Sequence, residues 1–350
     1  MEADPVSVSP CQARPSRCLR RGLAALCLGL LGCPALAAAR PPAGQGAKAL
    51  IQTRGQPLRA GVMSGDGVVA LERAEGGDTP ILPFATPRGS LRLLLDTGAA
   101  TSMVTPAVAE RLGLRLHPLA PGDFSMAGGG QACQQLNLFS ARLPVLALAG
   151  EAGAPAGPRI NGLEVLVTPV AALPPGVDGV LGAPTLRQQP LVVDPLAGRV
   201  ALGRSALRWR PTRGPSPQVL PLLWRLGVPL LPLQLGGAGA TPLPGGEALA
   251  DTGAEGLFLT APLAQRLTPL GPSQPARLVG VCGLQEVRRQ RLLGIGLGGP
   301  GASLEAVEAI ILANPVFALL GVEAIVGQEF FRSRRQLWRL DAVPPRLELW

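Results

Sequence analysis

The fold is decided by DTGAATSMVTPAVAERLG, Asp96–Gly113, and by DTGAEGLFLTAPLAQRLT, Asp251–Thr268. Aligned without gaps, the two stretches have 8 of 18 residues in common, beginning with Asp-Thr-Gly-Ala. Internal similarity of this kind indicates a duplicated structural unit. We therefore expect two related halves, each built around one Asp-Thr-Gly motif.

The residues around each motif predict the same local structure. An apolar strand, Leu91–Leu95 or Ala248–Ala250, runs into the aspartate. After it, Thr105 or Thr260 is placed to cap a short helix that has proline in its first turn. Apolar residues then continue at helical spacing. Each motif should therefore sit between a buried strand and a capped helix.

Two further elements recur in each half. The stretches 177–182 and 322–327 each end in two apolar residues and a glycine. The stretches 125–135 and 278–287 each contain the glycines of a hairpin turn. The similarity therefore extends well beyond the motif itself.

Composition favours an all-β protein with a few short helices. The 350 residues include 46 Gly and 38 Pro, which punctuate short apolar runs typical of strands and turns. We expect a leader over 1–39, a linker or pro-segment over 40–74, a first lobe over 75–207, an interlobe linker over 208–217 and a second lobe over 218–350.

The rare residue types exclude several chemistries. The chain has one His, one Lys and no Tyr. A Ser-His-Asp site would have to use His117, which we expect to be a surface loop residue, and a His-rich zinc site cannot form. Any enzyme here must work mainly with carboxylates. The net charge of +9 comes from scattered Arg with few aromatic residues, which argues against a nucleic-acid partner.

The N-terminal stretch has the order of a secretory signal. Arg14, Arg17, Arg20 and Arg21 precede the apolar run Gly22–Leu31. The stretch Ala35–Ala37 then offers a small-residue cleavage site. Lipid attachment at Cys33 and retention as an uncleaved anchor are the alternatives. The expected location is secreted or periplasmic, with a membrane tether only through such an anchor or lipid.

Two of the six cysteines, Cys133 and Cys282, lie beyond this leader. They occupy similar places in the two hairpin stretches. An oxidising compartment would permit a disulfide between them, but the sequence gives no distance, and two unpaired buried thiols are an equal alternative.

The paired aspartates suggest amide hydrolysis. Without a metal or a nucleophilic side chain, this reaction needs an activated water and a protonated leaving amine, and two carboxylates that share a proton provide both. The Thr97 and Thr252 hydroxyls can bond to backbone across the two-fold. Gly98 and Gly253 permit close backbone approach and supply N–H groups to the carboxylates.

Over residues 75–350, the chain resembles the pepsin and retropepsin family of aspartic peptidases. The resemblance rests on Asp96–Ala99, on Asp251–Ala254 and on the apolar-apolar-glycine elements at 180–182 and 325–327. It implies a bilobal β fold with pseudo-two-fold symmetry and a cleft between the lobes. Both motifs in one chain imply a monomer that needs no cofactor and no metal.

The resemblance also implies roles for individual residues. Asp96 and Asp251 would be the catalytic dyad of an aspartic endopeptidase that acts on peptide or protein substrates. The residues expected to support the active-site loops are Thr97, Gly98, Ala99, Thr252, Gly253 and Ala254. By position, the flap over the substrate would be Gly128, Gly129, Gly130 and Gln131.

Two departures from the pepsin pattern bear on activity. Pepsins carry a flap Tyr, which this chain lacks, and a Ser or Thr after the motif, where this chain has Ala99 and Ala254. Retropepsin-type enzymes manage without either residue. Losing that hydrogen bond should raise the lower pKa of the dyad, so we expect a less acidic working range than that of pepsin. The alternative function is a non-catalytic peptide-binding protein on the same fold.

Overall fold

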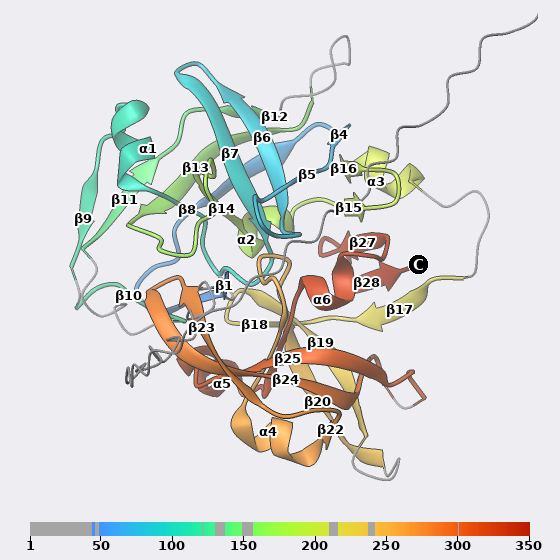
Figure 1. The fold of residues 1–350 in the computed structure, drawn as a ribbon. Helices are drawn as coiled ribbons and strands as arrows, with labels where there is room; N and C mark the ends of the chain where they lie inside the picture. Colours follow the sequence, from blue (N-terminus) through green and yellow to red (C-terminus); the bar gives the residue numbers. More distant parts are fainter. Residues whose placement is uncertain are drawn as a thin grey trace, which may run out of the picture. The chain divides into compact units, whose positions relative to one another are not determined.

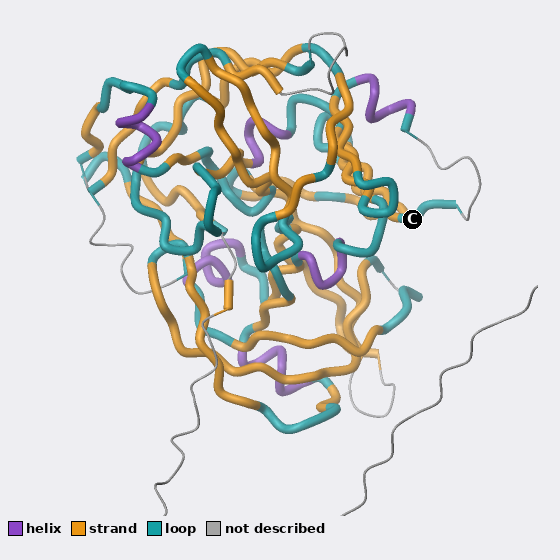
Figure 2. Tube along the Cα trace, turned by 45° about the horizontal axis from the view of Figure 1, so that its top comes forward, coloured by secondary structure: helices purple, strands orange, loops and turns teal. Residues whose placement is uncertain are grey.

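The computed structural model describes residues 44–45, 49–120, 122–129, 137–148, 157–209, 216–236, 242–299 and 301–350. The predicted leader and Cys33 lie outside these residues. Within the described part, no helix is long and apolar enough to span a membrane. The predicted mostly β architecture is confirmed, because strands dominate and the helices have only four to six residues (Figures 1 and 2).

Residues 49–209, the first half, hold most of their strands in one ten-stranded sheet. The elements are β2 (Leu50–Arg54), β3 (Ala60–Ser64), β4 (Gly67–Ala70), β5 (Glu72–Arg73), β6 (Pro80–Thr86), β7 (Gly89–Asp96), β8 (Met103–Val104), α1 (Pro106–Arg111), β9 (His117–Leu119), β10 (Ser125–Gly128), β11 (Leu138–Arg142), β12 (Leu146–Leu148), β13 (Arg159–Val167), β14 (Gly179–Gly182), α2 (Ala183–Leu186), β15 (Leu191–Asp194), β16 (Arg199–Leu202) and α3 (Arg204–Arg208).

Residues 216–350, the second half, form a second ten-stranded sheet that also takes in β1 (Gly44–Gln45). The elements of the second half are β17 (Gln218–Pro221), β18 (Leu223–Arg225), β19 (Val228–Gly236), β20 (Pro242–Ala250), β21 (Leu257–Leu259), α4 (Ala261–Arg266), β22 (Thr268–Pro269), β23 (Gln274–Gly280), β24 (Gly283–Leu297), β25 (Glu305–Ile311), α5 (Pro315–Leu320), β26 (Ala324–Val326), α6 (Gln328–Phe331), β27 (Gln336–Arg339) and β28 (Arg346–Leu349).

The two halves repeat one core topology. In the first half, β14 lies between β7, to which it is parallel, and β8, to which it is antiparallel. In the second half, β26 lies in the same way between β20 and β21. The buried strands β7 and β20 lead directly to the two Asp-Thr-Gly motifs. This repeat gives the predicted bilobal fold its pseudo-two-fold symmetry.

The helices after each motif begin where the sequence predicts. Helix α1 has Thr105 as its N-cap, and the Thr105 side chain accepts a hydrogen bond from the Val108 N–H. Helix α4 has Thr260 as its N-cap, which accepts from the Leu263 N–H. Proline stands in the first turn of both helices. A threonine cap and a proline in the first turn act locally, so the same residues define the start of the helix in both halves.

A third sheet of six strands joins the halves, in the order β17-β28-β27-β15-β16-β4. Its centre is the antiparallel pair of β15 from the first half and β27 from the second. The strands of the first half start earlier than residue 75, the lobe boundary given by the sequence. Strands β3 and β4 pair with β13 and β16, because their short apolar runs complete existing sheet edges.

The largest apolar cluster is built from both halves. It contains Leu95 and Leu181 from the first half with Ala250, Val326 and Trp338 from the second. These residues are fully buried or nearly so. The strands that carry the two motifs are therefore fixed by burial on both sides.

Candidate active site

The structure brings Asp96 and Asp251 together. Asp96 is the last residue of β7, Asp251 follows β20, and both are fully buried. A Cβ atom at Gly98 would overlap the Asp251 carboxyl group, and a Cβ atom at Gly253 would overlap the Asp96 carboxyl group. Each carboxyl therefore packs against the glycine of the opposite loop, and only glycine fits there.

Each loop also donates a backbone hydrogen bond to its own aspartate. The Gly98 N–H donates to Asp96 Oδ1 at 2.8 Å, and the Gly253 N–H donates to Asp251 Oδ1 at 2.8 Å. These bonds orient both carboxyl groups. The equal distances follow from the repeated loop geometry.

Thr97 and Thr252 lock the two loops to each other. The Thr252 hydroxyl accepts from the Thr97 N–H, and the Thr97 hydroxyl accepts from the Thr252 N–H, both at 3.0 Å. The Thr97 hydroxyl donates to the Ala250 carbonyl at 2.5 Å, and the Thr252 hydroxyl donates to the Leu95 carbonyl at 2.8 Å. Four crossed bonds therefore hold the aspartates in a fixed relative position.

The apolar-apolar-glycine elements support the loops from below. The Ala99 carbonyl accepts from the Ala183 N–H at 2.9 Å, directly after Gly182. The Ala254 carbonyl accepts from the Gln328 N–H at 2.8 Å, directly after Gly327. A Cβ atom at either of these glycines would come too close to the supported loop.

Two side chains that complete this support were missed from the sequence. In the first half, Ser102 Oγ accepts from the Gly182 N–H at 3.0 Å. In the second half, Gln328 Nε2 donates to the Thr252 carbonyl at 2.7 Å. Gln328 is fully buried, and its position directly after an apolar-apolar-glycine element is the one signal that could have identified it.

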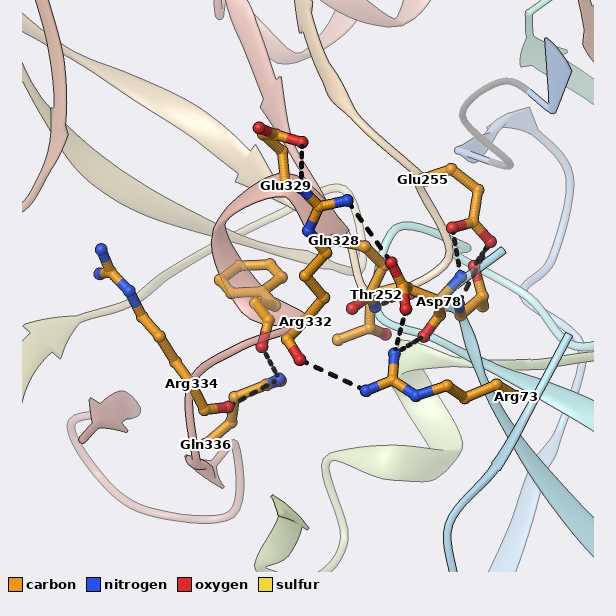
Figure 3. A network of polar contacts seen from close by, with 11 residues as sticks. Arg73, Asp78, Thr252, Glu255, Gln328, Glu329, Arg332, Arg334 and Gln336 are labelled. Carbon is orange, nitrogen blue, oxygen red and sulfur yellow. Dashed lines mark hydrogen bonds and ion pairs between the residues drawn. The ribbon is translucent and has the colours of Figure 1, made fainter. Parts of the chain in front are cut away.

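Glu255, directly after the second motif, joins the active-site loop to the first half (Figure 3). Its Oε2 accepts from the Asp78 N–H at 2.7 Å, and its Oε1 accepts from the Thr79 N–H at 3.1 Å and from the Thr79 hydroxyl. Arg73 donates to Asp78 Oδ1 at 2.6 Å and to the Arg332 carbonyl at 3.3 Å. This contact was not predicted from the sequence, although a carboxylate directly after a buried motif was a signal for it.

The predicted flap lies partly within the described residues. Gly128 ends β10 and Gly129 follows it, while Gly130 and Gln131 lie outside the described residues. The Gly129 carbonyl accepts from the Cys282 N–H at 2.8 Å. The hairpin stretches of the two halves therefore meet.

Three further residues were singled out in the sequence, His117, Cys133 and Cys282. His117 is exposed as expected, but it lies in strand β9 and not in a loop. Cys282 is disulfide-bonded, and its partner lies outside the described residues, as does Cys133. Across the described ranges, no group of three or more His, Cys, Asp or Glu could hold a metal ion.

Comparison with known proteins points to one class of domain. Residues 88–185 match the aspartyl protease family Asp_protease_2, and this stretch contains the first motif but not Asp251. Residues 88–185 of the chain are therefore similar to a domain of the aspartyl protease type. No curated protein matches the chain.

The solved structures that are similar to the chain include two seed globulins. One is conglutin gamma, a basic 7S globulin from lupine seeds, with 13% identity and a TM-score of 0.45. The other is the basic 7S globulin from soybean, with 12% identity and a TM-score of 0.43. Each alignment covers 81% of this chain and 94% of the globulin.

Proposed function

We propose that the protein is an aspartic endopeptidase whose catalytic dyad is Asp96 and Asp251. One observation carries the proposal: two buried aspartates end equivalent strands, and each packs against the glycine of the other loop. Two carboxylates held this close cannot both ionise cheaply, so one keeps a proton. A water between them then faces a base and an acid at once.

The reaction follows from that shared proton. The ionised carboxylate takes a proton from water as the water oxygen bonds to the peptide carbonyl carbon. The protonated carboxylate gives its proton to the carbonyl oxygen, which yields a tetrahedral diol. The C–N bond then breaks as the nitrogen takes a proton from one carboxyl group and the other carboxylate takes a proton from a diol hydroxyl, so a carboxylic acid and an amine leave and the dyad again holds one proton. The crossed Thr97 and Thr252 bonds keep the dyad in one geometry throughout.

Cleavage of an unbiased peptide library between acidic and neutral pH tests this proposal. Turnover should be inhibited by pepstatin, a statine-type transition-state analogue. Asp96→Asn and Asp251→Asn should each lower turnover by about 10²–10⁴-fold, because each removes one partner of the proton exchange. Unchanged turnover in either variant would overturn the assignment of the dyad.

The same experiment separates the alternative. A non-catalytic peptide-binding protein would bind pepstatin or library peptides without cleaving them. In that case the two Asn variants would alter binding but not product formation, since no product forms in any sample.

A further inference from the structure

A large cavity lies in the second half, between α4, α5, the hairpin strands β23 and β24, and the end of β25 (Figure 1). Its volume is about 930 Å³. None of the described residues that line it belongs to either Asp-Thr-Gly motif, to β2 or to β10. Ligand pockets in proteins commonly have volumes of about 300–1,000 Å³. This space, which we call the α5 cavity, is therefore large enough for a small molecule.

The walls of the α5 cavity are mainly apolar. Four of the lining residues belong to one buried apolar cluster of the second half: Val287, Leu312, Phe317 and Val322. Ala318, on α5, also lines the cavity and is exposed, so the cavity opens to solvent beside this residue. Binding sites for small molecules typically combine such apolar walls with a few polar groups that fix the orientation of the ligand.

The first half fills the corresponding place with its own side chains. Val177 corresponds to Val322, because each stands five residues before the glycine of an apolar-apolar-glycine element. Val177 packs in a buried cluster with Phe124 and Val170. In the second half, helix α5 precedes this position and Val322 lines the cavity instead. The duplicated unit therefore does not by itself require an open space here.

Asn314 brings an unused hydrogen-bond donor to the wall of the α5 cavity. The residue is only 7% exposed. Its Oδ1 accepts from the Val316 N–H at 3.0 Å, which caps α5. Among the described residues, its buried Nδ2 has no hydrogen-bond partner. A buried donor without an acceptor costs free energy, so a ligand oxygen that reaches this amide is favoured.

Arg288 adds a positive charge to the same wall. Its Nε donates to Ser273 Oγ at 2.7 Å and its Nη2 to the Ser273 carbonyl at 3.4 Å. Both acceptors are neutral, so they do not compensate the charge of the guanidinium group. Glu286 also lines the cavity, but its side chain is 72% exposed and pairs with Arg277. Thr260, the other polar lining residue, already caps α4.

We propose that the α5 cavity binds a small monocarboxylic acid with an apolar chain, whose carboxylate lies on the side of Arg288 and Asn314 and whose chain lies against Leu312 and Phe317. Strand pairing sets Arg288 opposite Ile311, three residues before Asn314, so the two donors come from neighbouring parts of the wall. Two donors, one of them cationic, favour an anion that only accepts hydrogen bonds. The site is separate from the dyad and does not depend on peptidase activity.

Titration calorimetry of the protein with sodium dodecanoate tests the polar end of the site. The wild type should show one saturable site. Arg288→Gln removes the charge, and Asn314→Asp keeps the cap of α5 but replaces the unused donor with an anion. Each variant should weaken dodecanoate binding about tenfold or more. Arg291→Gln, which is exposed on the same strand but does not line the cavity, is the matched control and should bind as the wild type does.

A second pair of variants tests the apolar end. Ala318→Trp places a large side chain in the cavity from an exposed position, so the fold should be kept and dodecanoate binding lost. Leu319→Trp, at the next exposed position of α5, which does not line the cavity, should bind as the wild type does. Urea unfolding of both variants checks that the protein is folded.

Dodecylamine, which has the same chain with a cationic head, tests the class of ligand. The wild type should bind dodecanoate about tenfold or more tightly than dodecylamine, because the donors of the wall repel a cation. Equal binding of acid and amine, or unchanged dodecanoate binding in both Arg288→Gln and Asn314→Asp, would overturn the carboxylate assignment. The absence of saturable binding to the wild type, or full binding to folded Ala318→Trp, would overturn the site itself.

Discussion

The Thr97 side chain both donates and accepts a hydrogen bond through one small hydroxyl group, as a serine could. Its fully buried hydroxyl donates to the Ala250 carbonyl and accepts from the Thr252 N–H. Thr97→Val keeps the shape but leaves both groups buried without a partner, which should lower the free energy of unfolding by about 2–4 kcal/mol. Activity should fall with it, because the dyad loses its fixed geometry.

Thr97→Ser is the control for this prediction, since it keeps the hydroxyl and removes one methyl group. It should retain most of the stability and turnover. Urea unfolding and kcat of both variants make the comparison. Equal values for Ser and Val would show that the crossed hydrogen bonds contribute nothing.

Ala99 sets the acidity at which the site is expected to work. It is fully buried next to the dyad and carries no hydroxyl. Ala99→Ser would add a donor that stabilises the ionised carboxylate, so the acidic limb of the pH–rate profile should move to lower pH. Wild-type activity should peak well above about pH 2, the region of the lower apparent pKa of the pepsin dyad. Profiles measured for both proteins with one peptide test this, and a wild-type peak near pH 2 would contradict it.

At the scale of elements, Glu255 couples the second active-site loop to the start of β6. Three donors from Asp78 and Thr79 converge on its carboxylate. Glu255→Gln places an NH₂ group against at least one of those donors, which should lower the free energy of unfolding by about 1–3 kcal/mol and reduce kcat. Glu286→Gln is the matched control, because the Glu286 side chain is 72% exposed in its ion pair with Arg277. Chemical denaturation and kcat distinguish the two variants.

The sequence predicted the elements whose signals are local. A threonine cap followed by proline defines α1 and α4, and an apolar run ending in Asp-Thr-Gly defines each motif strand. The pairing of Leu50 with Ala99 and with β10 carries no local signal, because these contacts join segments far apart in the chain. Strand β3 had no local signal for the same reason, since its pairing with the distant strand β13 makes it a strand.

The whole molecule depends on the six-stranded sheet that joins the halves. Asp194 ends β15 at the centre of that sheet and is fully buried. It accepts from Trp209 Nε1 at 2.8 Å and from Arg335 Nε at 2.5 Å, and Arg335 belongs to the second half. The backbone N–H groups of Leu196 and Ala197 also donate to it. One carboxylate thus ties the two halves together where their strands meet.

Burial raises the pKa of Asp194, but the hydrogen bonds from Trp209, Ala197 and Arg335 and the charge of Arg335 outweigh it, so the pKa lies below its ordinary value of 3.8. The folded protein therefore binds this proton more weakly than the unfolded chain does. The resulting stabilisation is complete above the ordinary pKa and is lost as the pH falls through the lowered one.

Asp194→Asn should accordingly lower the free energy of unfolding by about 1–3 kcal/mol at neutral pH, because the partly buried Arg335 and Trp209 donors lose their charged acceptor. The difference from wild type should shrink as the pH falls below the ordinary pKa of 3.8, where the unfolded chain takes up the proton first, and should be smallest once the pH is below the lowered pKa of the folded protein. Urea unfolding of both proteins at several pH values between 7 and 2 measures this. Asp341→Asn, which alters a partly exposed pair with Arg339, is the control and should cost less than about 1 kcal/mol at every pH. If the difference between Asp194→Asn and wild type did not change with pH, the negative charge of Asp194 would add nothing to the stability that its hydrogen bonds provide. The charge across the joining sheet would then contribute nothing to holding the two aspartate loops together in acid.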